Sequence, residues 1–163
     1  VPLSHMEVHL EGAQFDSTQL TSSGIFEFEN VLLENDLTLT PFRNGDDVNG
    51  VNTIDMVLIR KHILGITYFD SPYKLLAADV NQSGTVTTFD LVIIRKVILH
   101  MIPNFPIDSW LFIDADYDFQ NPENPYWEDY PKVKNFSPTA GEEYNFDFIG
   151  IKIGDVNGNA IPF

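Results

Sequence analysis

Apolar residues follow a helical spacing in two segments of the chain that are nearly identical to each other. Residues 55–64 (DMVLIRKHIL) align without gaps on residues 90–99 (DLVIIRKVIL), with seven of ten positions identical at an offset of 35 residues. So close a repeat predicts two copies of one structural unit, and the spacing of the apolar positions predicts a helix in each. Gly65 is expected to cap the first helix and Pro103 to end the second.

Alternation of apolar and polar residues predicts strands on both sides of this repeat. It is present at residues 7–11, 25–29 and 37–40, with a polar stretch between the first two, and residues 146–153 predict a late strand. Both predicted helices are apolar around most of their circumference, so they must pack on each other and on a further element. The sequence therefore predicts an α+β fold, in which a small antiparallel β-sheet packs on the helical pair.

Composition limits the partners and the kinds of site that the chain can offer. The formal net charge is −15, with 24 acidic residues against 9 basic ones, which disfavours binding to nucleic acid or anionic lipid. Cysteine is absent, so disulfides and thiolate metal sites are excluded. No stretch approaches the ~18 apolar residues of a membrane span, so we expect no membrane insertion. Any metal must be held by oxygen or imidazole.

Residues 79–90 (DVNQSGTVTTFD) fit a 12-residue calcium loop. Calcium takes about six to eight oxygen ligands, and such a loop supplies them from alternating positions. Gly84, at position six, permits the sharp turn, and Thr87 would act through water. The expected direct ligands at positions one, three, five, seven and twelve are Asp79, Asn81, Ser83, the carbonyl of Thr85, and Asp90.

This repeat resembles the dockerin domains (type I-like) of secreted bacterial modular proteins, whose two loop–helix units each close their calcium loop with aspartate. Ser71 and Pro72 predict the start of a short helix before the second loop, whereas strand residues and Pro41 precede the first, and this asymmetry also matches the family. The resemblance implies one to two calcium ions, or three if a further site exists. It also implies a secreted or cell-surface protein and a cohesin-like partner domain.

The first loop departs from this pattern. Counting back from Asp55 gives a loop that begins at Asn44, but position five is Val48 and the glycine arrives one place late. On this count the expected ligands are Asn44, Asp46, Asn52 and Asp55. A shortened loop that begins at Asp47-Val-Asn49 is the alternative.

The residues that close each loop, and a third Asp-Val-Asn triplet, can be explained without a metal ion. Asn52 with Asp55, and Thr87 with Asp90, would each make a helix N-cap with an acid in the first turn. A third Asp-Val-Asn triplet occurs at residues 155–157. Asp155 and Asn157 could complete the irregular first site or build an additional one, but a terminal Asx-type turn is the interpretation we favour.

The resemblance also implies which residues would meet a cohesin-like partner. Dockerins use residues just before each closing aspartate and basic residues within the helices, here Thr53, Ile54, Arg60, Lys61, Thr88, Phe89, Arg95 and Lys96. The two similar copies would allow two docking poses related by a pseudo-twofold axis. Ile54 and Phe89 are apolar, which fits docking but also fits burial under the flanking segments. We favour burial, in which case the module is a calcium-rigidified spacer.

The pattern divides the chain into four parts. Residues 1–6 read as a tag remnant, residues 7–42 as a β-strand segment, residues 43–103 as the dockerin-like repeat, and residues 104–163 as an aromatic and acidic tail that wraps the module. The strand segment loosely resembles a carboxypeptidase-regulatory-like β-sandwich.

The residues of the tail also raise the alternatives of carbohydrate binding and enzymatic activity. The tail residues Trp110, Tyr126, Trp127 and Tyr130 lie among Asp114, Asp116, Glu128 and Asp129 and could form a calcium-assisted carbohydrate platform, although core packing explains aromatic residues more often. Exposure of two or more coplanar rings would favour a sugar. No carboxylate or histidine stands in a catalytic sequence setting, so no enzymatic activity is expected.

Overall fold

The repeat folds into two helices, α1 (Thr53–Ile63) and α3 (Thr88–Ile98), which pack against each other. A short helix, α2 (Pro72–Ala78), lies between them in the chain, and Ser71 is its N-cap residue as predicted. The computed structural model describes residues 3–31 and 36–161, so the first two residues of the expected tag remnant lie outside it. Within these ranges, every helix is too short or too polar to cross a membrane.

Both repeat helices end in the same way. Gly65 (φ +66°) and His100 (φ +52°) occupy equivalent left-handed positions, and their backbone N–H groups donate to the carbonyls of His62 (3.0 Å) and Val97 (2.9 Å). The expectation that Pro103 ends the second helix was wrong, because the left-handed turn at His100 already terminates it. The two copies therefore end their helices with the same backbone geometry, although the residues at this position, Gly65 and His100, differ.

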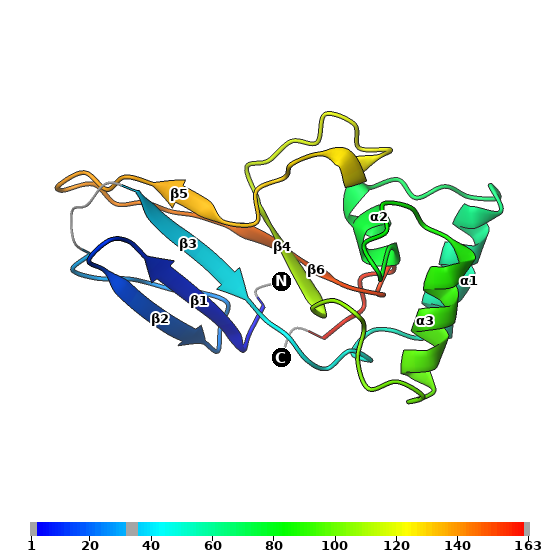
Figure 1. The fold of residues 1–163 in the computed structure, drawn as a ribbon. Coiled ribbons are helices and arrows are strands. Elements are labelled where there is room, and N and C mark those ends of the chain that lie inside the picture. Colours follow the sequence, from blue (N-terminus) through cyan, green and yellow to red (C-terminus); the bar gives the residue numbers. More distant parts are fainter. Residues whose placement is uncertain (1–2, 32–35, 162–163) are drawn as a thin grey trace.

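The strands form two antiparallel sheets. A four-stranded sheet has the order β2-β1-β3-β5, and its strands are β1 (Met6–Glu11), β2 (Asp16–Thr21), β3 (Leu37–Phe42) and β5 (Lys134–Phe136). A two-stranded sheet pairs β4 (Trp110–Asp114) with β6 (Phe148–Lys152), the late strand that the sequence predicted. Figure 1 shows the four-stranded sheet at one end, the helices at the other, and β4 and β6 between them.

One predicted strand was wrong. Residues 25–29 are not a strand, and β2 instead lies in the polar stretch before them. As the edge strand of the described sheet, β2 pairs with β1 and buries only Thr21, so polar residues are tolerated there. Residues 25–29 run beside it: the Gln19 amide donates to the Glu27 carbonyl (3.2 Å) and accepts from the Glu27 N–H (2.7 Å). The Gln19 side chain therefore makes the two hydrogen bonds that the backbone of a paired strand would otherwise make.

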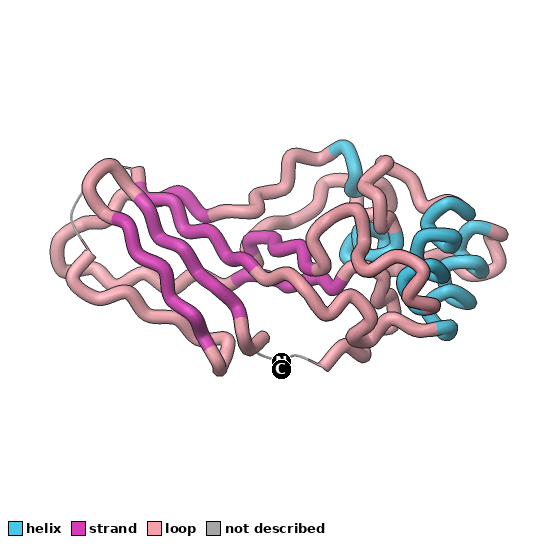
Figure 2. The backbone as a smooth tube through the Cα atoms, turned by 60° about the horizontal axis from the view of Figure 1, so that its bottom comes forward, coloured by secondary structure: helices cyan, strands magenta, loops and turns pink. Residues whose placement is uncertain are grey.

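Strand β4 contributes to two hydrophobic cores. Leu111 and Ile113 belong to the core formed with the helices, whereas Trp110 and Phe112 belong to the core formed with the four-stranded sheet. This follows from the period of two in a strand, which places successive side chains on opposite faces. Figure 2 shows this strand pair joining the strand end of the molecule to its helical end. Met6, expected in a tag remnant, is buried in β1.

Candidate calcium sites of the two repeats

The second loop begins where α2 ends. Asp79 is only 2% exposed, and its carboxylate accepts backbone hydrogen bonds from Ser83 (2.9 Å to Oδ1) and Gly84 (2.8 Å to Oδ2). Gln82 (φ +51°) and Gly84 (φ +83°) supply the left-handed backbone that curls the loop around this carboxylate. The loop is therefore organised around a buried charge at its first position.

Asp90 closes the loop from the first turn of α3. Its Oδ2 accepts hydrogen bonds from the backbone (2.8 Å) and hydroxyl (3.1 Å) of Thr87, which completes the capping box expected from the sequence. Its Oδ1 is buried and has no hydrogen-bond partner among the described residues. A buried carboxylate oxygen without a partner needs an explanation. Capping uses only one oxygen, and the free one is what a calcium ligand would present.

The remaining predicted ligands of the second loop lie around the same turn. Asn81 Oδ1 accepts from the Ser83 N–H (3.1 Å), and the Ser83 hydroxyl donates to the Thr85 carbonyl (3.1 Å). The structure therefore brings Asp79, Asn81, Ser83, Thr85 and Asp90 together in one loop. Their oxygens form the hard donor set that calcium prefers.

Two aromatic residues that the sequence did not assign to this site lie beside it. The Tyr126 hydroxyl donates to the Leu75 carbonyl (3.1 Å), and burial, followed by the charges of Asp79 and Asp90, raises the pKa of this phenol. The Trp127 ring lies 3.7 Å from the position that a Cβ on Gly84 would occupy. Both residues come from the 3₁₀ turn η1 (Pro125–Trp127) of the tail, which no local signal connects to the loop.

Residues 44–49 of the first loop make other contacts. The Asn44 amide donates to Asp108 (2.8 Å) and its oxygen accepts from the Ser109 N–H (3.0 Å). Asp47 accepts from the Asn104 amide (2.7 Å). Asp46 is exposed and has a left-handed backbone (φ +54°). These contacts hold the segment against residues 104–109.

Asp55 closes the first loop and is fully buried. Its Oδ2 accepts from the Asn52 N–H (2.9 Å), as Asp90 does from Thr87, and its Oδ1 accepts from Val156 (3.0 Å) and Asn157 (3.3 Å). Burial raises the pKa of Asp55, and the charge of Asp155 raises it further. The structure thus brings Asp155 and Asn157 next to Asp55.

The two candidate sites are rich in neutral oxygen donors. In the described parts of the chain, no three His, Cys, Asp or Glu side chains converge as a metal cluster. The predicted ligands of each loop instead include two carboxylates, and amide, hydroxyl and carbonyl oxygens would supply the rest. A low ligand charge of this kind weakens calcium affinity without excluding it.

We expect the metal-free protein to lose stability as pH rises above the ordinary aspartate pKa. Burial, followed by the charge of Asp79, raises the pKa of Asp90 above its ordinary value of 3.8. Between the ordinary and the raised value, the folded protein binds more protons than the unfolded chain, so its unfolding free energy falls with rising pH. Calcium needs deprotonated ligands, so the loaded protein should show the opposite slope. Melting temperatures of stripped and calcium-loaded protein from about pH 4 to about pH 7 test this, and parallel slopes would contradict it.

The eight predicted partner-contact residues are all exposed on α1, α3 and their N-terminal ends: Thr53, Ile54, Arg60, Lys61, Thr88, Phe89, Arg95 and Lys96. The expectation that Ile54 and Phe89 are buried was wrong, because each is 59% exposed. The helices bury the opposite face, through Ile59 on α1 and Ile94 on α3. Within residues 3–31 and 36–161, neither the strands nor the tail covers the outer face.

The predicted aromatic platform is not formed. Of its four rings, Trp110 is buried, Tyr126 and Tyr130 are partly buried in the helical core, and only Trp127 is widely exposed, at 79%. Asp114 is paired with Lys134 (2.7 Å) rather than lining a sugar surface. The condition set for a carbohydrate site, two or more exposed coplanar rings, is therefore not met by these residues.

Comparison with known protein families identifies the repeat. The family model described as the dockerin type I domain matches residues 44–99, which include both repeat helices and the second loop. No curated protein and no solved structure matches the chain. The α+β fold and the predicted family resemblance are both confirmed. Residues 44–99 of this chain therefore match the type I dockerin domain, a family of calcium-binding modules for protein–protein docking.

Proposed function

We propose that this chain is a docking module of an extracellular modular protein, and that the outer face of α1 and α3 binds a cohesin-like domain. The observation that carries this proposal is the matched exposure of equivalent side chains. Ile54 and Phe89 are each 59% exposed, and Leu64 and Leu99 are 60% and 55% exposed. Soluble domains seldom leave such apolar groups together on one face unless a partner covers them.

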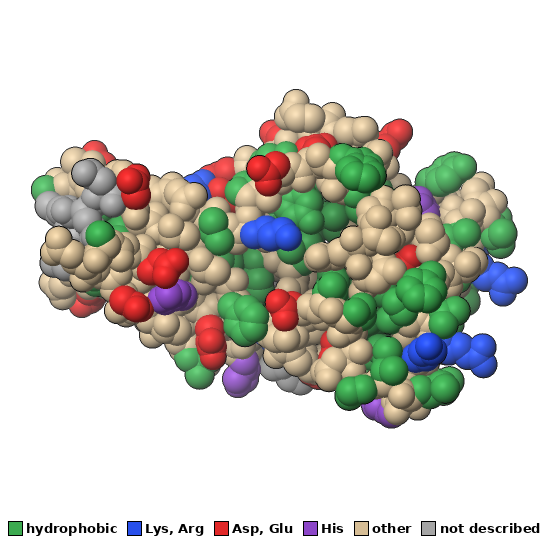
Figure 3. All heavy atoms as spheres, viewed as in Figure 1, with side chains coloured by type: hydrophobic (Ala, Val, Ile, Leu, Met, Phe, Trp, Pro, Cys, Tyr) green, Lys and Arg blue, Asp and Glu red, His purple; other side chains and the backbone are tan. Residues whose placement is uncertain are grey.

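The distribution of basic residues also supports the outer face of α1 and α3 as the docking surface. Four of the nine basic residues of the chain, Arg60, Lys61, Arg95 and Lys96, lie exposed on these two helices. Figure 3 shows Lys, Arg and hydrophobic side chains gathered over the end of the molecule formed by α1 and α3. A partner surface that is apolar at its centre and acidic at its rim would complement this face. The repeat would let the partner bind in two orientations.

Calcium would hold this face together through the second loop. Asp79 and Asp90, with Asn81, Ser83 and the Thr85 carbonyl, would bind one ion between the end of α2 and the start of α3. The ion would neutralise the two buried carboxylates and fix the position of Phe89, which precedes Asp90. The spacer alternative is less favoured, because it requires Ile54 and Phe89 to be covered within the chain.

We expect the double variant Ile54→Ala/Phe89→Ala to bind cohesin domains at least about 100-fold more weakly, whereas each single variant loses much less. Apolar anchors at an interface centre dominate affinity, and each single variant leaves one of the two poses intact. Calorimetric titration against a panel of purified cohesin domains, with and without calcium, measures the effect.

Leu20→Ala is the matched control, since Leu20 is 68% exposed on β2, away from the helices. Binding by the double variant at wild-type strength, or an equal loss from Leu20→Ala, would place the docking surface elsewhere. Failure of the wild type to bind any cohesin domain would contradict the cohesin-like partner.

A further inference from the structure

We propose that the first calcium site of this dockerin domain is assembled from two distant segments, with residues 155–160 supplying its first half and residues 50–55 its second half. This inference rests on the proposed calcium function and specifies which residues hold the second ion. In the second loop, all twelve positions are contiguous. In the first site, positions one to six would come from the tail and positions seven to twelve from the residues at the start of α1.

The two segments together align on all twelve positions of the second loop and are identical to it at six of them. Residues 155–160 (DVNGNA) align on 79–84 (DVNQSG) at an offset of 76 residues (155 minus 79). Residues 50–55 (GVNTID) align on 85–90 (TVTTFD) at the repeat offset of 35 residues (85 minus 50). Positions one, three, five and twelve are then Asp155, Asn157, Asn159 and Asp55, and the Gly50 carbonyl takes position seven. Asn159 was not among the ligands predicted from the sequence, although it continues the one-three-five spacing.

The tail segment also repeats the backbone geometry of the second loop. The Asp155 carboxylate accepts from Asn159 (3.3 Å to Oδ1) and Ala160 (2.7 Å to Oδ2), as Asp79 accepts from Ser83 and Gly84. Asn157 Oδ1 accepts from the Asn159 N–H at 3.1 Å, as Asn81 does from Ser83 at 3.1 Å. Gly158 (φ +72°) has the left-handed conformation of Gln82.

The two segments meet where the second loop is covalently continuous. Position six, Ala160, abuts position seven, Gly50: a Cβ added to Gly50 would lie 2.6 Å from the Ala160 backbone. Next to this junction, the Asn49 amide donates to the Ile161 carbonyl (2.7 Å) and accepts from its N–H (2.9 Å). Gly50 therefore permits a contact that a larger side chain would block, and the amide of Asn49 holds the tail in register.

The chemistry at this junction favours a cation. Asp55 is fully buried and Asp155 is 7% exposed, and Asp55 Oδ1 accepts from the N–H of Val156, the residue after Asp155 (3.0 Å). Among the described residues, neither carboxylate makes an ion pair with Lys, Arg or His. Lys152 is near Asp155, but its ammonium donates to the Asp47 carbonyl (3.2 Å). Two buried carboxylates are costly unless a cation compensates them.

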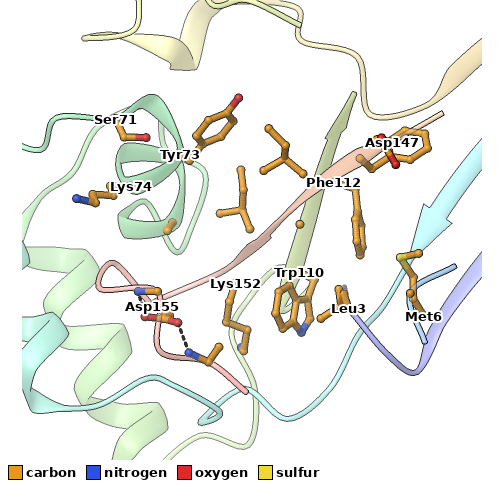
Figure 4. A pocket seen from close by; sticks show the side chains of 18 of the residues that line it. Leu3, Met6, Ser71, Tyr73, Lys74, Trp110, Phe112, Asp147, Lys152 and Asp155 are labelled. Carbon is orange, nitrogen blue, oxygen red and sulfur yellow. Dashed lines mark hydrogen bonds between the residues drawn. The ribbon is translucent and has the colours of Figure 1, made fainter. Parts of the chain in front are cut away.

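The site also has an opening to solvent. Asp155, Asn157, Gly158 and Ala160 line one end of a pocket of about 680 Å³, which extends past Trp110 towards β1. Figure 4 shows Asp155 and Lys152 among the labelled side chains of this pocket. A calcium ion could reach the tail segment from there without opening of either hydrophobic core.

The test is calcium stoichiometry, measured by calorimetric titration of the metal-stripped 163-residue chain with calcium chloride. Wild type is expected to bind two ions, and Asp155→Asn and Asn157→Ala to bind one, which Asp79→Asn then removes. Asp46→Asn is the matched control, because a contiguous first loop would use Asp46 whereas the split site does not. Hydrogen exchange provides a second readout: calcium should slow exchange of the Gly158 and Ala160 amides, both bonded to Asp155.

The other outcomes distinguish failure of the split site from failure of the proposed calcium function. Two ions in Asp155→Asn, or the loss of one ion in Asp46→Asn, would overturn the split site and leave calcium binding intact. A wild type that binds one ion, lost in Asp79→Asn, would also overturn the split site alone. A wild type that binds no calcium would overturn the proposed function as well.

Discussion

Removal of calcium should lower the melting temperature of the chain by about 10–20 °C if two ions are bound, and by about half of that for one. An ion at about 100 times its Kd stabilises the folded state by about 2.7 kcal/mol, and 1 kcal/mol shifts the melting temperature of a domain of this size by about 2–4 °C. The physical origin is the pair of buried carboxylates in each site, Asp79 with Asp90 and Asp55 with Asp155. Without a cation, their desolvation and mutual repulsion oppose folding.

Helical circular dichroism during heating, in saturating calcium and in excess chelator, measures this effect. Magnesium is the control ion, since it is smaller, prefers octahedral geometry and retains its water. Magnesium at the same concentration should restore little of the lost stability. Equal melting temperatures in calcium and chelator would mean that the loops act as helix caps alone.

The variant Ile113→Ala should destabilise the helical end of the molecule although Ile113 lies in β4, outside the dockerin segment. Ile113 is fully buried and packs in the helical core. Truncation of a buried isoleucine costs about 2–5 kcal/mol, which corresponds to a decrease of roughly 5–20 °C in melting temperature. Since β4 also carries Trp110 and Phe112 in the other core, both cores should unfold together.

Helical circular dichroism and tryptophan fluorescence should therefore report one transition, shifted by the same amount. Ile25→Ala is the matched control, because the same side chain is removed at a position that is 72% exposed. Two separate transitions, or an unchanged melting temperature in Ile113→Ala, would show that the tail and the dockerin segment fold independently.

The features that the sequence predicts correctly are local. The ten-residue repeat specifies α1 and α3, and the side chains of the second loop lie within twelve consecutive positions. Their spacing therefore carries the turn geometry. Ser71-Pro72 likewise marks the start of α2 because an N-cap and a first-position proline act within one turn.

The features that the sequence did not predict depend on distant contacts. Residues 25–29 alternate as a strand does, but β2 takes the edge of the sheet and a glutamine side chain pairs with them. Exposure of Ile54 and Phe89 depends on where the tail lies, which no local pattern encodes. The third Asp-Val-Asn triplet is visible in the sequence, but only the fold shows that the residues after Asp155 donate to Asp55.

The bonds between Asn49 and Ile161 join positions 112 residues apart. A nascent chain leaves the ribosome from its N-terminus, so every residue of the second loop is available once α3 emerges, whereas Asp55 must wait for the backbone N–H groups of Val156 and Asn157. The start of the first repeat is therefore completed after the second loop has been made. A chain that ended between η1 and residue 155 would keep the side chains of the second loop and lose the partners of Asp55, the reverse of what the order of the two repeats in the chain would suggest.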